Sequence, residues 1–243
     1  MRESEQDPLQ AFRRINVDAT LNLARQAASL GVRRFVFISS IKVNGESTVA
    51  GRPYTADDSP MPTDPYGISK CEAEQGLMQL AAETGMEVVV IRPVLVYGPG
   101  VAANFLGMMR WLYRAVPLPF GAIDNRRSLV YIDNLVDLIA TCIKHPAAAN
   151  QVFLASDGND VSTSDLLRQL GAALGKPSRL VSVPQGLLVV LARLAGRGDL
   201  AQRLFGSLQV SIDKNRTLLG WEPPVTLEQG LKSTAQYFIE GRQ

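Results

Sequence analysis

The sequence predicts an α/β fold in which helices alternate with the strands of a parallel sheet. Two short, continuous apolar runs, residues 33–39 and 86–91, are rich in β-branched residues, as is typical of strands buried on both faces. Each run follows a predicted helix, 9–30 or 65–84, and a glycine ends each helix. In the first helix the apolar residues recur every three or four positions. This repeated helix–strand order predicts a parallel sheet.

The remaining elements follow in chain order. Residues 42–63 contain several glycines and prolines and are expected to form a long loop, of a kind that tends to carry function. Residues 92–100 are expected to form the exit from the second strand. Further helices are predicted at 102–115, 133–144, 163–174, 185–195, 213–219 and 227–240, and extended segments at 128–132, 151–155 and 180–183. The apolar face between Leu187 and Leu194 is expected to be core or a subunit contact, because it lacks the basic flank of a membrane anchor.

Composition excludes several classes of function. The 243 residues are 46% hydrophobic and 20% charged, which is ordinary for a globular protein. Lys+Arg 25 against Asp+Glu 23 gives a net charge of +2, so charge offers no case for binding nucleic acid. No apolar run approaches the ~20 residues of a membrane span, and residues 1–10 are too polar for a signal peptide. We therefore expect a cytoplasmic protein that binds no membrane.

Few residues are available for metal or nucleophilic chemistry. The single histidine, His145, lies before a proline at a predicted helix end, where a structural role is expected. Two cysteines, Cys71 and Cys142, make neither a disulfide framework nor a metal set. A zinc site or a histidine-based triad is therefore not expected.

The residues that carry chemistry follow the first predicted strand. Ser39 and Ser40 lie at its carboxyl end, where ligands bind in parallel sheets. Tyr66 and Lys70 are four residues apart on the following helix and so share a face. A tyrosine with a pKa near ~10 is a poor base at neutral pH, and a nearby ammonium favours the phenolate. With a serine bonded to the same substrate oxygen, these groups can move a proton on and off an alcohol.

Several motifs then resemble one known family in the right order. The sequence is similar to extended short-chain dehydrogenase/reductases, within the nucleotide-sugar epimerase/dehydratase family, over essentially its whole length. The matching segments are FVFISSIKVNG at 35–45, YGISK at 66–70, IRPVLVYGPG at 91–100, RSLVYIDNLVD at 127–137 and LGWEP at 219–223. The resemblance implies a Rossmann-type sheet that binds NAD or NADP, with a smaller C-terminal α/β domain for a nucleoside-diphosphate sugar. We expect the first domain at 1–160, with an excursion into the second at about 100–126, and mostly the second domain at 161–243.

The resemblance also implies roles for residues at the catalytic centre. Tyr66 matches the catalytic base, Lys70 the residue that lowers its pKa and binds the nicotinamide ribose, and Ser40 the hydroxyl that orients the sugar oxygen. Ser39 and Pro93 match positions that contact the cofactor. A simpler interpretation of Ser40 is a cap at the strand end.

Three further residues match positions near the substrate. Asn104 matches a contact to the diphosphate, although it could instead cap the helix at 102–115. Arg127 matches an arginine that pairs with the diphosphate, and a forked guanidinium suits phosphate. The alternative interpretation of Arg127 is a solvent-exposed loop arginine beside Arg126. Asn16 matches an asparagine near the active-site wall but is expected mainly to bond within its own helix.

The sequence departs from the family in one respect. It contains no Gly-x-x-Gly-x-x-Gly turn, whose backbone amides hold the cofactor pyrophosphate. The resemblance therefore implies that roughly 70–90 residues of the first half of the family's Rossmann domain are missing. We expect this chain to bind NAD weakly or not at all. The residue that selects NAD or NADP in the family belongs to the missing half.

The family contains several chemistries. Ser40 is followed by Ile41 and Lys42, not by the Asp-Glu pair of the dehydratases. A UDP-sugar 4-epimerase, similar to UDP-glucose 4-epimerase, is the first expectation. The alternatives are an NAD(P)H-dependent 4-ketosugar reductase of surface-polysaccharide synthesis and an inactive fragment that acts as a binding module. By analogy with the family, a homodimer would form through the helices at 9–30 and 65–84.

Overall fold

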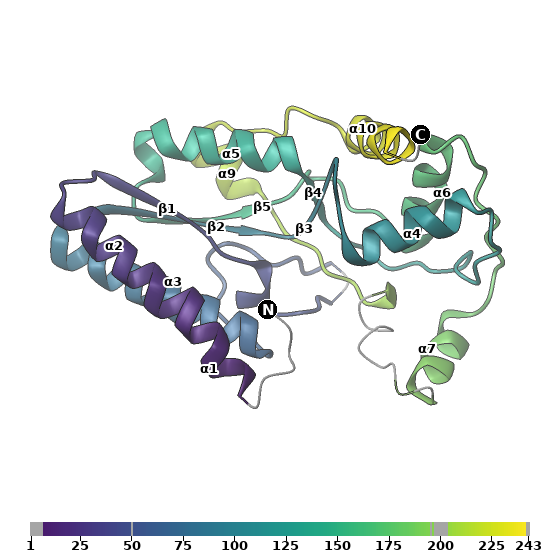
Figure 1. The fold of residues 1–243 in the computed structure, drawn as a ribbon, viewed down its shortest axis with the longest axis horizontal. Helices are drawn as coiled ribbons and strands as arrows, with labels where there is room; N and C mark the ends of the chain where they lie inside the picture. Colours follow the sequence, from purple (N-terminus) through teal and green to yellow (C-terminus); the bar gives the residue numbers. More distant parts are fainter. Residues whose placement is uncertain (1–6, 50, 195, 197–203, 242–243) are drawn as a thin grey trace.

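A parallel three-stranded sheet lies between helices in the left half of Figure 1. This is a computed structural model, and it describes residues 7–49, 51–194, 196 and 204–241. The strand order is β1-β2-β5, and β2 is hydrogen-bonded to both neighbours. The bounds are Arg34–Ile38 for β1, Glu87–Pro93 for β2 and Gln151–Ala155 for β5. The predicted α/β class with a parallel sheet is confirmed.

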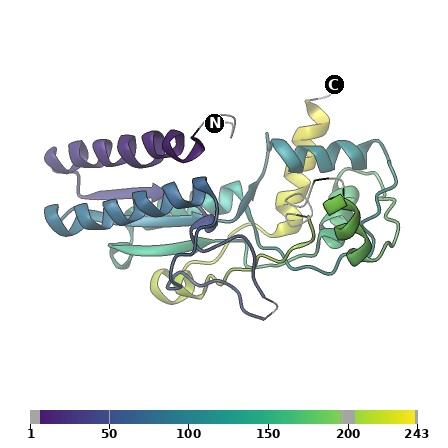
Figure 2. The same cartoon turned by 90° about the horizontal axis from the view of Figure 1, so that it is seen from below.

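Helices cover both faces of this sheet, as Figures 1 and 2 show. One face carries α1 (Pro8–Arg13), the π-helical segment η1 (Arg14–Ala19), α2 (Thr20–Ser29) and α3 (Pro65–Thr84). The other face carries α5 (Ile132–Lys144) and α9 (Asp213–Leu219). The helix predicted as continuous over 9–30 is thus interrupted by a wider π turn. Gly85 ends α3 with a φ of 75°, in the left-handed region that favours glycine.

The strands differ in burial. Val88 and Val90 of β2 pack into the core beneath α2 and α3, whereas Val89 and Ile91 pack into the core beneath α5. This strand is buried on both faces, as predicted. The same prediction is wrong for β1, where Ile38 is 36% exposed. The reason is that β1 is the outermost strand of the sheet in the part of the chain that the structure describes.

A second core lies beside the sheet. Strands β3 (Leu95–Tyr97) and β4 (Leu129–Tyr131) form a parallel pair next to it. Three helices, α4 (Ala103–Tyr113), α6 (Thr163–Ala173) and α10 (Leu227–Glu240), pack around this pair. The sequence analysis did not separate β3 from the exit segment at 92–100.

The chain after residue 161 contributes to both cores. Val210, Ile212 and Trp221 pack into the first core with Phe153 of β5, whereas α6 and α10 belong to the second. The predicted division into two domains, 1–160 and 161–243, does not coincide with the division between the two cores and remains a prediction.

The apolar helix α7 (Gln185–Leu194), expected in the core or at a subunit contact, is only partly buried in this chain, and the subunit contact remains a prediction. Leu188 and Val189 pack near Phe205, but Leu187 is 51% and Leu194 is 80% exposed. Among the described helices, none is both long and apolar enough to cross a bilayer. The helix predicted at 185–195 includes residue 195, which lies outside the described residues. Residues 1–6, part of the segment judged too polar for a signal peptide, also lie outside them.

The long loop at 42–63 is fixed to a distant part of the chain. It begins in a short 3-10 turn, η2 (Ile41–Val43). The backbone nitrogen of Tyr54 donates to the Gln209 carbonyl at 2.9 Å, and Tyr54 forms a bridge with Val210. Gly45 has a φ of 147°, and a Cβ there would collide with the Tyr54 hydroxyl. The loop that directly follows β1 is therefore an ordered segment, held in place by these contacts.

Candidate active site

Ser40 and Tyr66 meet at the carboxyl end of β1. Ser40 caps η2, since its Oγ accepts a hydrogen bond from the Lys42 backbone nitrogen at 3.3 Å. Tyr66 lies in the first turn of α3, whose N-cap Asp64 accepts from the Gly67 nitrogen at 2.7 Å. The Ser40 hydroxyl lies near enough to the Tyr66 hydroxyl to lower its pKa. The two hydroxyls that the sequence analysis paired are thus adjacent.

The Tyr66 hydroxyl lies in a half-buried setting that disfavours its ionisation. Burial has the largest effect and raises the pKa of Tyr66, while the charge of Lys42 lowers it. The Asp64 carboxylate raises the same pKa, and the Ser40 hydroxyl lowers it. The ring of Phe12 meets the Tyr66 ring edge-on, with the ring centroids 5.6 Å apart. The net effect is a raised pKa, so the phenol is protonated at neutral pH.

Lys70 occupies a different place from the one that its spacing predicts. Its Nζ donates to the Ile38 carbonyl at 2.9 Å and lies 4.5 Å from the centroid of the Phe37 ring. Burial lowers the pKa of Lys70, and the nearby Glu74 raises it. The positive charge that acts on the Tyr66 hydroxyl is that of Lys42. A direct effect of Lys70 on the phenol therefore remains a prediction.

A buried polar cluster lies directly behind these residues. Arg92 of β2 donates to the Glu74 carboxylate of α3, with Nη2 and Oε2 2.6 Å apart, and both side chains are almost fully buried. The Arg92 Nη1 also donates to Asn44 at 2.9 Å. The Ser39 hydroxyl donates to the same carboxylate. That hydroxyl therefore donates within the cluster, and a contact between Ser39 and the cofactor remains a prediction.

The sequence analysis missed Glu74 and Arg92, although a signal for each was present. Arg92 directly follows the apolar run of β2, where a charge needs a partner. Glu74 lies four residues after Lys70 and so projects from the same face of α3.

Two other predicted residues lie at the edges of this arrangement. Pro93 ends β2, is buried and stands opposite Ala155 of β5. Asn16 lies in η1, where its Nδ2 donates to the Ser69 hydroxyl at 2.9 Å, and that hydroxyl donates to the Tyr66 carbonyl at 2.8 Å. The expectation that Asn16 bonds within its own helix is therefore wrong. The π turn connects it to the start of α3, and such turns often occur at functional sites.

Arg127 and Asn104 lie in the second part of the structure. Arg127 Nη1 donates to the Gly206 carbonyl at 3.0 Å, and burial lowers the pKa of its guanidinium. No carboxylate pairs with it among the described residues, so it is not the solvated arginine of the alternative interpretation. Asn104 is exposed in the first turn of α4, and Ala102 occupies the cap without a side-chain bond. The capping alternative for Asn104 is therefore wrong.

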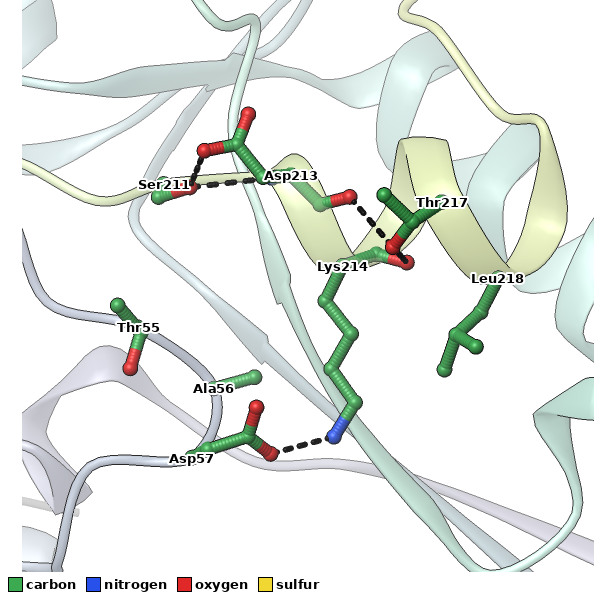
Figure 3. Close-up of a pocket in the computed structure, with 8 residues that line it drawn as sticks. All are labelled: Thr55, Ala56, Asp57, Ser211, Asp213, Lys214, Thr217 and Leu218. Carbon is green, nitrogen blue, oxygen red and sulfur yellow. Dashed lines mark hydrogen bonds and ion pairs between the residues drawn. The ribbon is translucent and has the colours of Figure 1, made fainter.

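The structure also has an open groove of about 430 Å³ between the loop and α9 (Figure 3). Thr55 and Asp57 line one side and Asp213, Lys214 and Thr217 the other, and Lys214 is paired with Asp57 at 2.6 Å. The described residues that line it include none of the predicted site residues. This groove is therefore not the candidate active site.

Comparison with known proteins was made on sequence and on structure. Residues 1–155 match the NAD dependent epimerase/dehydratase family. The chain is 53% identical over 241 residues to the UDP-glucose 4-epimerase of Vibrio cholerae, covering 99% of this chain and 74% of that protein.

Solved structures agree in fold. The UDP-glucose 4-epimerase of Thermotoga maritima, in complex with UDP-glucose, matches with a TM-score of 0.74 at 26% identity, over 98% of this chain and 73% of its own. RMD from Pseudomonas aeruginosa, in complex with NADPH, matches with a TM-score of 0.77 at 23% identity, over 96% of this chain and 76% of its own.

Proposed function

The chain belongs to the NAD dependent epimerase/dehydratase family, and from this premise we propose that it carries the catalytic centre of a UDP-sugar 4-epimerase. The observation that carries the proposal is that Ser40, at the carboxyl end of β1, and Tyr66, in the first turn of α3, lie close together. Ligands of parallel sheets bind at this end of the strands. The 53% identity to the Vibrio cholerae enzyme supports UDP-glucose and its 4-epimer as the substrate pair.

In this proposal Tyr66 moves the proton and Ser40 orients the alcohol. The phenolate of Tyr66 takes the proton from the sugar C4 hydroxyl and later returns it to the ketone oxygen. The Ser40 hydroxyl bonds the same sugar oxygen and holds it toward Tyr66. Because burial raises the pKa of Tyr66, catalysis requires positive charge near the phenol.

The residues at this edge fit the nicotinamide end of an NAD(P) cofactor. Lys70 is partly desolvated, and its ammonium donates to a backbone carbonyl at the strand end, so it can also reach hydroxyl groups of a ribose. Pro93, at the end of the neighbouring strand, would line the ring. When bound, the cofactor accepts the C4 hydride and gives it back. The pyrophosphate end has no such support, because the sequence contains no glycine-rich turn.

The diphosphate of the substrate would be held by Arg127 and Asn104. Arg127 is held on a backbone carbonyl, and no carboxylate neutralises it among the described residues. A half-buried guanidinium without a carboxylate partner among the described residues favours an anionic ligand. Asn104 is exposed in the first turn of α4, where backbone N–H groups also favour anions.

A homodimer through α1, α2 and α3 is part of the proposal. Leu23 and Leu30 of α2 are 59% and 83% exposed, which supports a contact on this face. Sedimentation velocity of the wild type and of Leu23→Glu tests it, and a monomeric wild type would contradict it. A cytoplasmic location also remains a prediction.

The replacement Tyr66→Phe tests the proposed chemistry. The purified chain is incubated with NAD and UDP-glucose or UDP-galactose, and the sugars are separated by chromatography. Tyr66→Phe should lower turnover by about 100-fold or more, because it removes the proton-transferring group. Tyr237→Phe, at an exposed tyrosine of α10, is the matched control and should leave turnover unchanged.

The absorbance of reduced cofactor separates the two oxidoreductase chemistries. An epimerase consumes no net NADH, whereas a 4-ketosugar reductase, which would use the same Ser40 and Tyr66, oxidises NADPH with each turnover. Equal turnover in the wild type and in Tyr66→Phe would reject the role given to Tyr66.

A further inference from the structure

Helix α7 exposes an apolar face to solvent. Four side chains that recur at i, i+3, i+4 and i+7 share this face and are between 51% and 80% exposed: Leu187, Val190, Leu191 and Leu194. The opposite face packs into a small core with Phe205. A contiguous apolar face of this kind is typical of an interaction site. We call these four residues the α7 face.

The chain around the α7 face is basic. Residues 101–123 and 166–194 contain six basic residues and no acidic residue, whereas the whole chain has a net charge of only +2. The two segments lie side by side, because the Val181 nitrogen donates to the Leu118 carbonyl at 2.8 Å and Phe120 packs beside α7. Figures 1 and 2 show α4, α6 and α7 at the same end of the molecule. The α7 face therefore belongs to a positively charged part of the structure.

The basic side chains of these segments are accessible. Arg110 and Arg114 of α4, and Arg179 shortly before α7, are exposed. None of these three has a carboxylate partner among the residues that the structure describes. Lys176 is also exposed and lies over the Tyr113 ring, 5.6 Å from its centroid. These cations are therefore accessible to an anionic partner.

Two aspartates flank the acid-free segments. Asp165 is paired with Arg168 at 2.7 Å, so these two charges balance. Asp124 is exposed directly after the first segment. The exposed arginines and lysine of the two segments outnumber it, so this surface keeps a net positive charge.

We propose that this part of the chain docks on a membrane surface rich in anionic lipid. The α7 face lies at the boundary between headgroups and acyl chains, and the surrounding cations meet the lipid phosphates. Docking of this kind needs no spanning helix, and none of the described helices is long and apolar enough to span. The inference goes beyond the proposed reaction, because the α7 face includes none of the residues assigned to that reaction.

The sequence pointed away from a membrane because α7 has no basic flank of its own. The fold supplies such a flank from Lys176 and Arg179, in the segment that leads into α7, and from α4 at the same end of the molecule. An apolar helix face with arginine and lysine beside it is the usual composition of a peripheral membrane helix.

Charge also separates a lipid surface from other occupants. Two copies of the chain that met symmetrically through the α7 face would place the same basic residues opposite each other. Repulsion between these like charges opposes such a pair. A nucleic acid would satisfy the cations, but its phosphate backbone offers no apolar surface to the α7 face. An anionic bilayer offers both phosphates and an apolar layer.

Vesicle binding tests the proposal without substrate or cofactor. The purified chain is sedimented with vesicles of equal parts phosphatidylglycerol and phosphatidylcholine, and with vesicles of phosphatidylcholine alone. We expect binding to the anionic vesicles only. This binding should weaken as sodium chloride is added, because salt screens the attraction between the cations and the lipid phosphates.

The double variant Val190→Gln/Leu191→Gln tests the apolar part of the surface. Loss of two apolar side chains from the bilayer boundary should lower the affinity for anionic vesicles by about 10-fold or more. Val136→Gln/Ile143→Gln is the matched control, because it replaces two exposed apolar residues of α5, and it should leave the affinity unchanged. All four side chains are exposed, and circular dichroism checks that each variant keeps its fold.

The double variant Lys176→Gln/Arg179→Gln tests the charged part. Each cation close to an anionic surface adds about five-fold to the affinity, so this variant should bind anionic vesicles about 10-fold more weakly or worse. The control Arg25→Gln/Lys144→Gln also removes one arginine and one lysine, which are exposed on α2 and α5. It should bind as the wild type does.

Three outcomes overturn the proposal. One is a wild type that binds neither kind of vesicle, or both equally. Another is vesicle binding that either test variant leaves unchanged, or that its control lowers as strongly. The third is self-association of the wild type, in sedimentation velocity, that Val190→Gln/Leu191→Gln abolishes, which would make the α7 face a contact with a second copy. Because vesicle binding needs no turnover, its failure is distinguishable from failure of the epimerase proposal, which the Tyr66→Phe assay decides.

Discussion

Replacing Glu74 by methionine should lower the free energy of unfolding by about 3–5 kcal/mol, the usual cost of removing one partner from a buried ion pair. Glu74 and Arg92 are 5% and 4% exposed. The change leaves the Arg92 guanidinium buried without its carboxylate, after loss of contacts at 2.6, 3.0 and 3.2 Å. It also removes the acceptor of the Ser39 hydroxyl.

Urea unfolding followed by tryptophan fluorescence measures this loss. Trp221 is buried in the sheet core, whereas Trp111 is 46% exposed, so a Trp111→Phe background leaves the core tryptophan as the probe. At an m-value of about 3 kcal/mol/M, the midpoint should fall by roughly 1–1.7 M urea. Arg168→Met removes an ion pair with Asp165 whose side chains are about half exposed, and it should cost no more than about 1 kcal/mol.

The double variant Glu74→Met/Arg92→Met makes the test specific. It removes both charges together, and such replacements are often neutral or stabilising. We therefore expect the double variant to be more stable than Glu74→Met alone. A loss below about 1 kcal/mol in Glu74→Met, or a double variant that loses the sum of both single costs, would refute the reasoning that an unpaired buried charge is responsible.

Two further predictions concern binding and pH. Arg127→Met should weaken UDP-glucose binding in calorimetry by about 10-fold or more, because a charge-assisted bond to phosphate is lost. Arg126→Met, at the exposed neighbour, is the control, and equal affinities in both variants would contradict the assignment. A hydrogen bond from Arg34, with Nε and Oε2 2.8 Å apart, holds the pKa of Glu87 below its ordinary 4.5. The stabilisation is therefore full above that pH and is lost as pH falls through the lowered value. The difference in unfolding free energy between wild type and Glu87→Gln should be largest near neutral pH and vanish in acid; a difference that persists in acid would contradict it.

Much of the fold was predictable because the local signals agreed. The helix at 65–84 has a capping aspartate, a proline in its first turn and a glycine at its end, and the structure has α3 at Pro65–Thr84. Strand β5 also has the predicted bounds, 151–155. By contrast, nothing in the spacing of residues 14–19 indicates a π turn. That turn depends on the packing of η1 against α3.

The candidate site was predictable in its hydroxyls but not in its charges. Ser40 and Tyr66 were paired from their positions at a strand end and a helix start, and the structure places them together. The spacing of Tyr66 and Lys70 predicts a direct charge effect, which remains a prediction; the structure shows the Lys70 ammonium bonded to a carbonyl of β1. Lys42 pairs with Asp64 only because the loop after β1 folds back onto the start of α3. Such a contact between segments more than 20 residues apart leaves no periodic pattern in the sequence.

The attachment of the loop at 42–63 to residues 207–211 has a consequence for the order in which the protein is made. Thr48 and Tyr54 form their backbone bonds with Ser207 and Gln209, about 155 residues further along. On a ribosome, the helix and strand that hold Tyr66 emerge long before these partners do. The loop is then fixed only after residue 209 has emerged, and nascent chains that end before that residue should lack this attachment, however well their sheet has formed.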